Sequence, residues 1–366
     1  MARSLKVAQE YIQKVKSSLQ RNSYPSQKAL ADDLGISLST VKNFLSSKSV
    51  DYQYFVEICQ KLGLDWQEIA FKESDTQPNS ITIFEESSPF ITGSPITHPR
   101  HFFGRQKELK RLFDLLKRHP LQNAAIIGKR RISKTSLLHY LKNITTTPPE
   151  QLRSGQKYDW LPYPENSKWI FVDFQDTRMA SRERLLSYIL ECLSLKVPTP
   201  CNLDYFMDVV SDNLHSPAVI LLDEIGVGLQ RCPELDDEFW ECLRSLATNH
   251  TRGNLAFVLA THESPIELAR NTGHSSPFFN IFGYTATLGA LTEAEARELI
   301  ASSPVAFPNE DVEWILQQSQ CLPLLLQILC RERLFSLEDG ETDDWREEGL
   351  RQIKPFEHLL DTGSKR

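Results

Sequence analysis

A basic segment in the first half of the chain carries residue types that can hold phosphate groups. Residues 128–135 read GKRRISKT, between an apolar run at 124–127 and a helical stretch that continues to about residue 143. The segment follows the pattern G-x-x-x-x-G-K-[ST], in which backbone N–H groups and the positive end of a helix surround phosphates. There the lysine reaches the β- and γ-phosphates of a nucleotide, and the hydroxyl residue after it binds Mg²⁺. The predicted phosphate-binding residues are Gly128, Ser133, Lys134, Thr135 and Ser136, with Thr135 also a predicted metal ligand.

The segment departs from the pattern at Ser133, which stands where the second glycine belongs. The loop often needs a positive φ at this position, which costs a non-glycine residue about 1–3 kcal/mol. If all of that cost appeared in binding, nucleotide affinity would fall about five- to a hundredfold. We therefore expect weakened binding.

An acidic pair, Asp223 and Glu224, ends the apolar run 218–222. Asp223 would hold the magnesium shell, and Glu224 would polarise the attacking water. Strands also end in Asp because turns begin there, but a phosphate-binding pattern about 90 residues upstream favours the functional interpretation. Thr261 ends another apolar run and is expected to contact the γ-phosphate or the water. The predicted catalytic residues are Glu224, Lys134 and Thr261, and the predicted metal ligands are Thr135 and Asp223.

The elements that must position these residues are short apolar runs that alternate with helical stretches. The runs lie at 124–127, 169–172, 218–222 and 255–260, with a weaker one near 284–288. This alternation is typical of a mostly parallel sheet covered on both faces, and it predicts an α/β P-loop NTPase fold. We predict four segments: an all-α helix-turn-helix domain (1–72), a linker (73–98), the core (99–290), and a helical or winged-helix lid (291–366).

Several motifs in order resemble the AAA-like ATPases of the STAND class, over about residues 88–335. They are residues 102–105 (FFGR), the two segments above, residues 276–280 (SPFFN), Leu291-Thr292 and residues 322–327 (LPLLLQ). The resemblance implies ATP or ADP with Mg²⁺ as cofactors, an adenine pocket at Phe103, Gly104 and Arg105, and a lid turn at Pro323. It further implies a signalling switch that hydrolyses ATP to ADP and phosphate, with a nucleotide-dependent oligomer. Cys321 stands where the glycine of the lid turn is usual, which puts hydrolysis in doubt.

Residues 27–44 fit a helix-turn-helix and resemble the phage-repressor family. Gly35 would form the turn and Ser37 would cap the second helix. The predicted DNA-binding residues are Ser37, Ser39, Lys42, Asn43 and Lys48. The same packing serves in protein-interaction domains, so DNA and a protein both remain candidate partners.

Composition restricts the possible partners and cellular compartment of the protein. The net charge is −7, yet residues 1–70 hold nine basic and seven acidic side chains, which permits DNA binding without demanding it. Seven scattered cysteines without a CxxC pair fit a reducing cytosol, and no apolar run is long enough to span a membrane. Two hypotheses remain: a cytoplasmic nucleotide-dependent switch, or a non-catalytic regulator or adaptor that keeps the ATPase fold as a scaffold.

Overall fold

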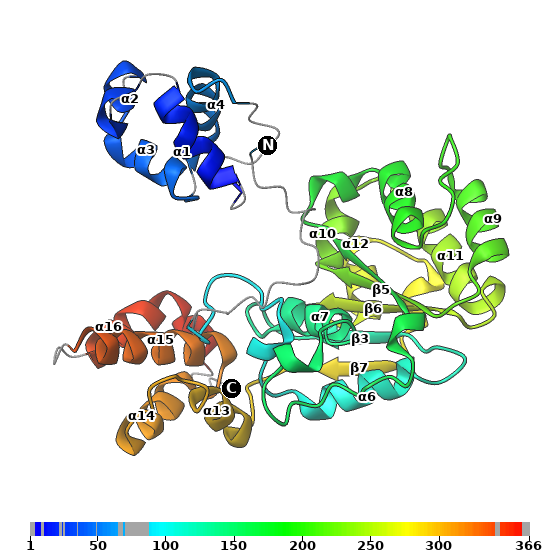
Figure 1. Cartoon of the computed structure of the whole chain (residues 1–366). Helices are drawn as coiled ribbons and strands as arrows, with labels where there is room; N and C mark the ends of the chain where they lie inside the picture. The colour runs from blue at the N-terminus through cyan, green and yellow to red at the C-terminus, as the bar shows by residue number, and fades with distance from the viewer. Residues whose placement is uncertain are drawn as a thin grey trace. The chain divides into compact units, whose positions relative to one another are not determined.

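The computed structural model describes residues 4–8, 11–21, 24, 26–34, 36–48, 50–64, 69, 88–340 and 345–360. The chain divides into two compact units, Met1–Phe84 and Glu85–Arg366 (Figure 1). Gly35, the side chain of Ser39 and residues 73–87 of the predicted linker lie outside the described residues.

The larger unit is built on a five-stranded sheet in the order β4-β5-β6-β3-β7. The strands are β3 (Ala124–Ile127), β4 (Lys168–Asp173), β5 (Ala218–Asp223), β6 (Leu255–Thr261) and β7 (Tyr284–Thr287). All neighbouring pairs are parallel, so the carboxyl ends of the strands meet at one edge. Figure 1 shows β5, β6, β3 and β7 following one another across the sheet. The predicted sheet is confirmed.

Helices cover both faces of this sheet. On one face, α6 (Gln106–Leu116) and α7 (Lys134–Asn143) share an apolar cluster with the strands. The other face carries α8 (Arg182–Cys192), α9 (Leu203–Asn213), α10 (Ile225–Arg231), α11 (Asp237–Ser245) and α12 (Pro265–Thr272). Because β5 and β6 are buried at every position, their sequences are continuous apolar runs rather than alternating ones.

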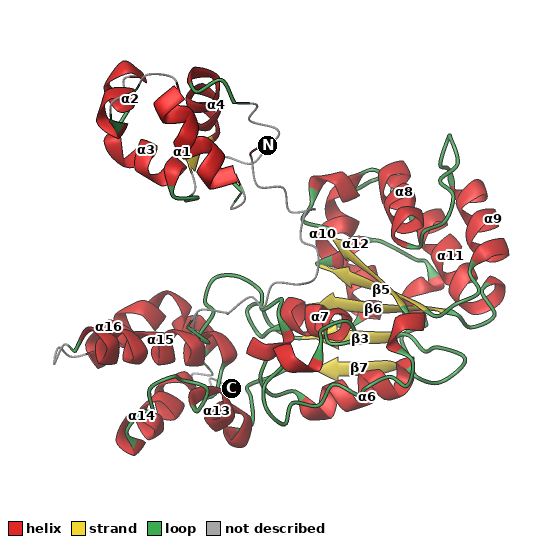
Figure 2. Cartoon of the chain, in the orientation of Figure 1, coloured by secondary structure: helices red, strands yellow, loops and turns green. Residues whose placement is uncertain are grey.

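The C-terminal part of this unit is helical. It comprises α13 (Glu293–Ile300), α14 (Asn309–Ser319), α15 (Pro323–Asp339) and α16 (Trp345–Ile353) (Figure 2). The first of these begins with a capping box formed by Thr292 and Glu295. Among residues 291–340 and 345–360, which the structure describes, this part of the chain forms helices and no strand.

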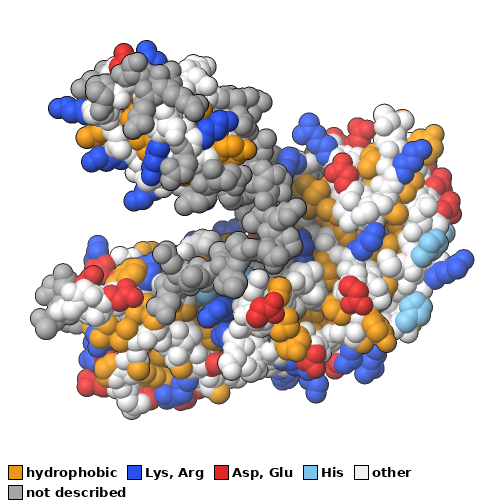
Figure 3. Space-filling view, viewed as in Figure 1, with side chains coloured by type: hydrophobic (Ala, Val, Ile, Leu, Met, Phe, Trp, Pro, Cys, Tyr) orange, Lys and Arg blue, Asp and Glu red, His pale blue; other side chains and the backbone are white. Residues whose placement is uncertain are grey.

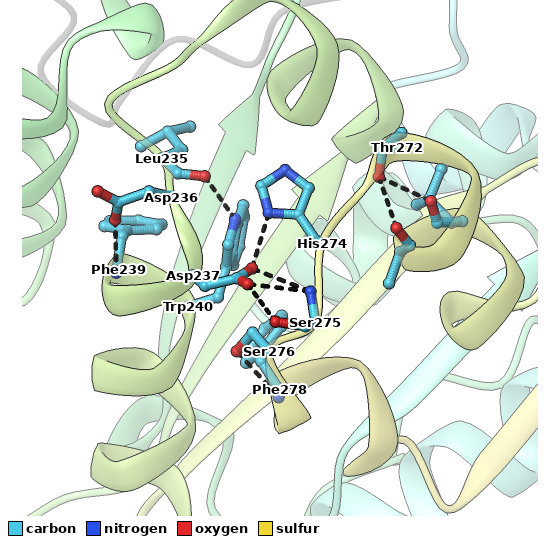
Figure 4. Close-up of polar contacts among 12 residues, drawn as sticks. Leu235, Asp236, Asp237, Phe239, Trp240, Thr272, His274, Ser275, Ser276 and Phe278 are labelled. Atoms are coloured by element: carbon cyan, nitrogen blue, oxygen red, sulfur yellow. Dashed lines mark hydrogen bonds and ion pairs between the residues drawn. The ribbon is translucent and has the colours of Figure 1, made fainter.

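A polar brace holds the loop after α12 to the start of α11 (Figure 4). Asp237 accepts hydrogen bonds from the Ser275 amide and hydroxyl, and its Oδ1 lies 3.0 Å from Nδ1 of His274. The Ser275 hydroxyl lowers the pKa of Asp237 to about 2, with further help from the Ser275 amide and His274. The hydroxyl donates to the carboxylate rather than to the imidazole. These three residues therefore form a structural brace and not a nucleophile activated by histidine.

Within its described residues the N-terminal unit has four helices: α1 (Ile12–Arg21), α2 (Gln27–Leu34), α3 (Leu38–Leu45) and α4 (Tyr52–Lys61). A short antiparallel pair joins β1 (Ser4–Leu5) to β2 (Val50–Asp51), which directly precedes α4. Leu30, Val41, Phe44 and Phe55 form the centre of its core. The Ser37 hydroxyl accepts a hydrogen bond from the Thr40 amide at 3.1 Å, so the predicted cap of the second helix is confirmed.

None of the helices in the described parts combines the length and apolar character that crossing a lipid bilayer requires.

Candidate functional site

A cavity of about 420 Å³ lies at the carboxyl edge of the sheet, between the core and the lid. Residues of the predicted nucleotide site that line it are Phe103, Arg105, Ser133, Lys134, Thr135, Ser136, Glu224 and Pro323. Gly104, Gly128, Asp223 and Thr261 do not line it. The fold thus brings two thirds of the predicted residues to one cavity from segments far apart in the sequence.

Lys134 lies at the start of α7, with only 6% of its surface exposed. Its ammonium group donates to the carbonyl oxygens of Gly128 and Lys129, at 2.8 and 2.9 Å. Burial lowers the pKa of this amine, while the neighbouring carboxylates of Glu224 and Asp223 oppose that shift. A buried cation at a helix N-terminus beside a cavity is an arrangement suited to anions.

The glycine at position 128 is required by close packing. A Cβ there would lie 2.7 Å from Cγ2 of Ile132 and 3.1 Å from the carbonyl oxygen of Leu288. Its amide donates to the carbonyl of Thr261 at 3.2 Å. Gly128 therefore anchors the loop to the sheet without touching the cavity itself.

Ser133 adopts the left-handed conformation, with φ of 75°. The expected positive φ is confirmed, and the loop has kept its backbone shape despite the serine. Arg131 in the same loop also has a positive φ, of 61°. Strain of this kind costs about 1–3 kcal/mol for a non-glycine residue.

Replacing Ser133 with Gly should tighten nucleotide binding by up to about a hundredfold, because up to about 1–3 kcal/mol of strain no longer lowers the population of the left-handed loop conformation in the free protein. Calorimetric titration of Mg·ATP measures the change, and turnover is followed in parallel. Ser194→Gly is the matched control, since Ser194 also has a positive φ (55°) but does not line the cavity. Equal affinities for Ser133→Gly and the wild type would show that the missing glycine does not limit binding.

Asp223 is the last residue of β5, and Glu224 follows it directly before α10. Asp223 is buried and accepts a hydrogen bond from the Thr135 hydroxyl, but its Oδ1 has no hydrogen-bond partner among the described residues. Burial raises the pKa of Asp223 to about 6, and Glu224 and Asp173 add to the rise. A hydroxyl and a buried carboxylate with a spare oxygen are oxygen ligands of the kind that Mg²⁺ prefers. The residues present therefore fit the ion.

Lowering the pH from 7.5 to 5.5 should weaken Mg·ATP binding about fourfold through Asp223, because a carboxyl with a pKa near 6 becomes mostly protonated over this interval. The shift is upward, so the loss begins at a higher pH than an ordinary carboxyl would give. Calorimetry at both pH values, on the wild type and on Asp223→Asn, tests this. The Mg·ATP affinities of the two proteins should differ less at pH 5.5 than at pH 7.5. An equal difference at both pH values would contradict the assignment of Asp223 as a ligand of Mg²⁺.

Glu224 lines the cavity at the start of α10 and has a φ of 51°. Non-glycine residues are held in this conformation only where the surrounding structure imposes it, and such positions cluster at functional sites. Glu224 is therefore placed to act on groups inside the cavity.

Thr261 is buried at the end of β6 and uses its carbonyl oxygen to hold Gly128. The next residue, His262, was not predicted to belong to the site. Its Nδ1 lies 3.3 Å from the same Gly128 carbonyl oxygen that accepts from Lys134. No feature of the sequence marked His262, because its position depends on how β6 lies beside β3.

The turn at 103–105 joins the core to the lid. Gly104 has φ of 74°, and a Cβ there would lie 2.9 Å from Cδ2 of Leu291, so the glycine permits close approach. Arg105 is buried and donates to the carbonyl oxygens of Gly289 and Ala290. Burial lowers the pKa of its guanidinium group.

On the lid side, Pro323 begins α15 and lines the cavity. The turn before it contains Cys321, whose φ is 57°, and Gln320, whose φ is 47°. The position where a glycine is usual therefore does require a left-handed backbone. The carbonyl oxygen of Cys321 accepts from the Leu291 amide at 2.9 Å, which ties this turn to the start of the lid.

Further lining residues were not predicted. They include Ile91, Gly93, Ser94, Pro95 and Ile96, as well as Gln175 and Gln327. The first five fall within the predicted linker, yet they form one wall of the cavity. The apolar side chains of Phe90, Ile91 and Ile96 among Ser, Gly and Pro residues are the sequence signal that could have identified this wall.

Comparisons with known proteins place the fold. No protein-family model matches the sequence, and no curated protein is significantly similar to it. The chain is similar to the structure of the Walker-type ATPase PABY2304 of Pyrococcus abyssi, with 17% identity, a TM-score of 0.51, and coverage of 72% of this chain and 75% of that one. It is also similar to the ORC2 protein of Aeropyrum pernix with ADPNP and ADP, with 15% identity, a TM-score of 0.53, and coverage of 75% and 74%. The ADP form of ORC2 gives 14% identity, a TM-score of 0.51 and the same coverage. The larger unit therefore has the α/β fold of an AAA-like P-loop NTPase.

Proposed function

We propose that the chain binds ATP or ADP together with Mg²⁺ in the cavity between core and lid. The observation that carries this proposal is the buried Lys134 at the start of α7, beside the hydrogen-bonded pair of Thr135 and Asp223. The solved structures of ORC2 with ADP and ADPNP support it at the level of the fold.

In this proposal Lys134 binds the β- and γ-phosphates, and Thr135 and Asp223 hold the Mg²⁺. The ion supplies charge neutralisation on the phosphates when it is bound. Glu224 orients a water and accepts its proton. Phe103 and Pro323 contact the base from the core and the lid, and Arg105 holds the turn between them.

Calorimetric titration of ATP and of ADP, each with and without Mg²⁺, into the full-length protein tests the proposal. We expect saturable binding that Mg²⁺ strengthens. Failure of both nucleotides to bind at high protein concentration would overturn it.

We further propose that nucleotide occupancy controls the N-terminal unit, as in STAND-type cytoplasmic switches that form nucleotide-dependent oligomers. A ligand that contacts both core and lid favours the arrangement in which both contacts exist, by its difference in affinity.

A second candidate function is a scaffold that binds nucleotide weakly and does not hydrolyse it. The left-handed conformations of Ser133 and Cys321 favour it, since both put strain at turns beside the cavity. Turnover by Ser133→Gly discriminates: a switch weakened by this strain would regain hydrolysis, whereas a scaffold would bind more tightly and remain inactive.

The partner of the N-terminal unit is proposed to be DNA, met by the face of α3. Lys42 on α3 and Lys48 just after this helix are exposed, and Figure 3 shows several basic side chains on the face of this unit in view. Ser37 uses its hydroxyl as a helix cap, and Asn43 is half-buried. Direct contacts would therefore rest mainly on the two lysines.

Removing both lysines (Lys42→Ala with Lys48→Ala) should weaken duplex DNA binding and lower the salt dependence of the binding constant by about two phosphate contacts. Fluorescence anisotropy at several salt concentrations measures both. Lys61→Ala is the control, because Lys61 is exposed in the same unit but pairs with Asp33 at 3.0 Å. Absence of DNA binding by the wild type at low salt would favour a protein partner instead.

A further inference from the structure

Residues 91–97, which we name the strap, line one wall of the cavity and connect α15 of the lid with α7 of the core. The two ends of the strap pack against different apolar clusters. Phe90, just before the strap, is buried in the cluster of the lid helices, whereas Ile96 packs against the cluster of α6 and α7. The strap is thus attached to both walls of the cavity.

The lid holds the first end of the strap with two side chains from one face of α15. Gln327, which is only 3% exposed, accepts a hydrogen bond from the Ile91 amide at 3.0 Å. Arg331 donates to the hydroxyl of Thr92. Residues four apart on a helix lie on the same face, so the two contacts act together.

The core holds the other end with two side chains from one face of α7. The Ser136 hydroxyl accepts from the Ile96 amide at 3.0 Å, and Asn143 donates to the carbonyl oxygen of Thr97 at 2.7 Å. Ser136 and Asn143 are seven residues, or two turns, apart. Ser136 is itself one of the predicted phosphate-binding residues, so this attachment lies within the predicted phosphate site.

The strap is short. Four residue steps separate Thr92 from Ile96, so the chain between the two attachments can extend over about 14 Å at most. Gly93, with φ of 86°, allows the turn between them. Separation of the two attachments beyond this reach therefore requires one pair of contacts to break.

We propose that the strap senses the occupancy of the cavity and passes it to the chain segment that leads into the N-terminal unit, with Gln327 and Asn143 as positioning residues. This inference rests on the proposed nucleotide binding. A nucleotide that contacts Lys134 on α7 and Pro323 on α15 keeps the two helices at one separation, and both attachments of the strap then persist. Without that bridge, the lid is free to draw the strap away from α7.

Hydrogen exchange of the full-length protein, followed by mass spectrometry on peptides that cover residues 88–98, tests the proposal with and without Mg·ATP. In the wild type, nucleotide should slow exchange of these peptides. Gln327→Met keeps the shape of the side chain but removes the acceptor, so exchange should be about tenfold faster and should no longer respond to nucleotide. Asn143→Ala should have the same effect from the opposite wall. Both variants should bind Mg·ATP about three- to thirtyfold more weakly.

Gln317→Met is the matched control, because it makes the same change at an exposed position of the lid. It should behave as the wild type. Circular dichroism melts establish that each variant is folded, and the two variants at opposite walls keep the test valid if one of them is not.

The outcomes separate the two proposals. If calorimetry shows no nucleotide binding by the wild type, the proposed function fails and the sensing role fails with it. If the wild type binds nucleotide but residues 88–98 exchange equally with and without it, the strap proposal alone is overturned. Equal exchange in Gln327→Met and Gln317→Met would likewise overturn it.

Discussion

Replacing Lys134 with Ala should abolish nucleotide binding by the full-length chain. The ammonium group is the buried cation at the start of α7, and charge-assisted hydrogen bonds of this kind each contribute about 1.5–3 kcal/mol. Loss of two such bonds to phosphate corresponds to an affinity decrease of at least about a hundredfold. Calorimetric titration of Mg·ATP into the wild type and Lys134→Ala measures the difference.

Two further variants serve as controls for Lys134→Ala. Lys134→Met keeps most of the buried side-chain volume. If Lys134→Ala and Lys134→Met both lose nucleotide affinity, the loss is due to the missing charge rather than to a collapsed loop. Lys142→Ala, in the last turn of the same helix, should bind as the wild type does. Wild-type affinity in Lys134→Ala would mean that the loop at 128–135 does not bind the phosphates.

Replacing Glu224 with Gln should leave Mg·ATP binding intact and lower the rate of hydrolysis by about a hundredfold or more. A positioned general base contributes about 10²–10⁴ to a rate, and the amide cannot accept the proton from water. The change spares Asp223 and Thr135, so the predicted ligands of Mg²⁺ remain. Phosphate release is measured at saturating Mg·ATP, alongside calorimetry on the same preparation.

Glu241→Gln is the control for this change, since Glu241 is exposed on α11 away from the cavity. Turnover that is equal in Glu224→Gln and the wild type would remove Glu224 from the reaction. Weaker nucleotide binding in Glu224→Gln would instead assign it a role in the metal site.

The local parts of the site were predictable because they depend on neighbouring residues. A strand followed by a glycine, a lysine and a helix specifies where the backbone N–H groups and the buried amine lie, and Lys134 lies there. The same reasoning predicted the positive φ of Ser133. Ser133 and Cys321 take a positive φ although neither is glycine, because the turn geometry and not the residue type sets the conformation. The alternation of apolar runs and helices likewise predicted the parallel sheet.

The segment 91–97 could not be predicted, because its structure comes from partners remote in sequence. Its Ser, Gly and Pro residues are typical of a linker, and it becomes a wall of the cavity only through Gln327, which is 236 positions away from Ile91, and Ser136, which is 40 away from Ile96. The sequence also left undecided whether the lid is helical or winged-helix, because helix periodicity does not exclude a small wing of strands.

By itself, then, the sequence determined the fold class, the backbone shape of the phosphate loop and the candidate residues at the ends of β3 and β5. These follow from spacing, apolar pattern and the demands of tight turns, which act over a few residues. Only the tertiary structure decided which candidates reach the cavity, that Asp223 has a pKa near 6, and that His262 and the strap lie beside the loop. The physical reason is that burial, desolvation and hydrogen-bond choice depend on which distant segments pack together, and no local pattern specifies that packing.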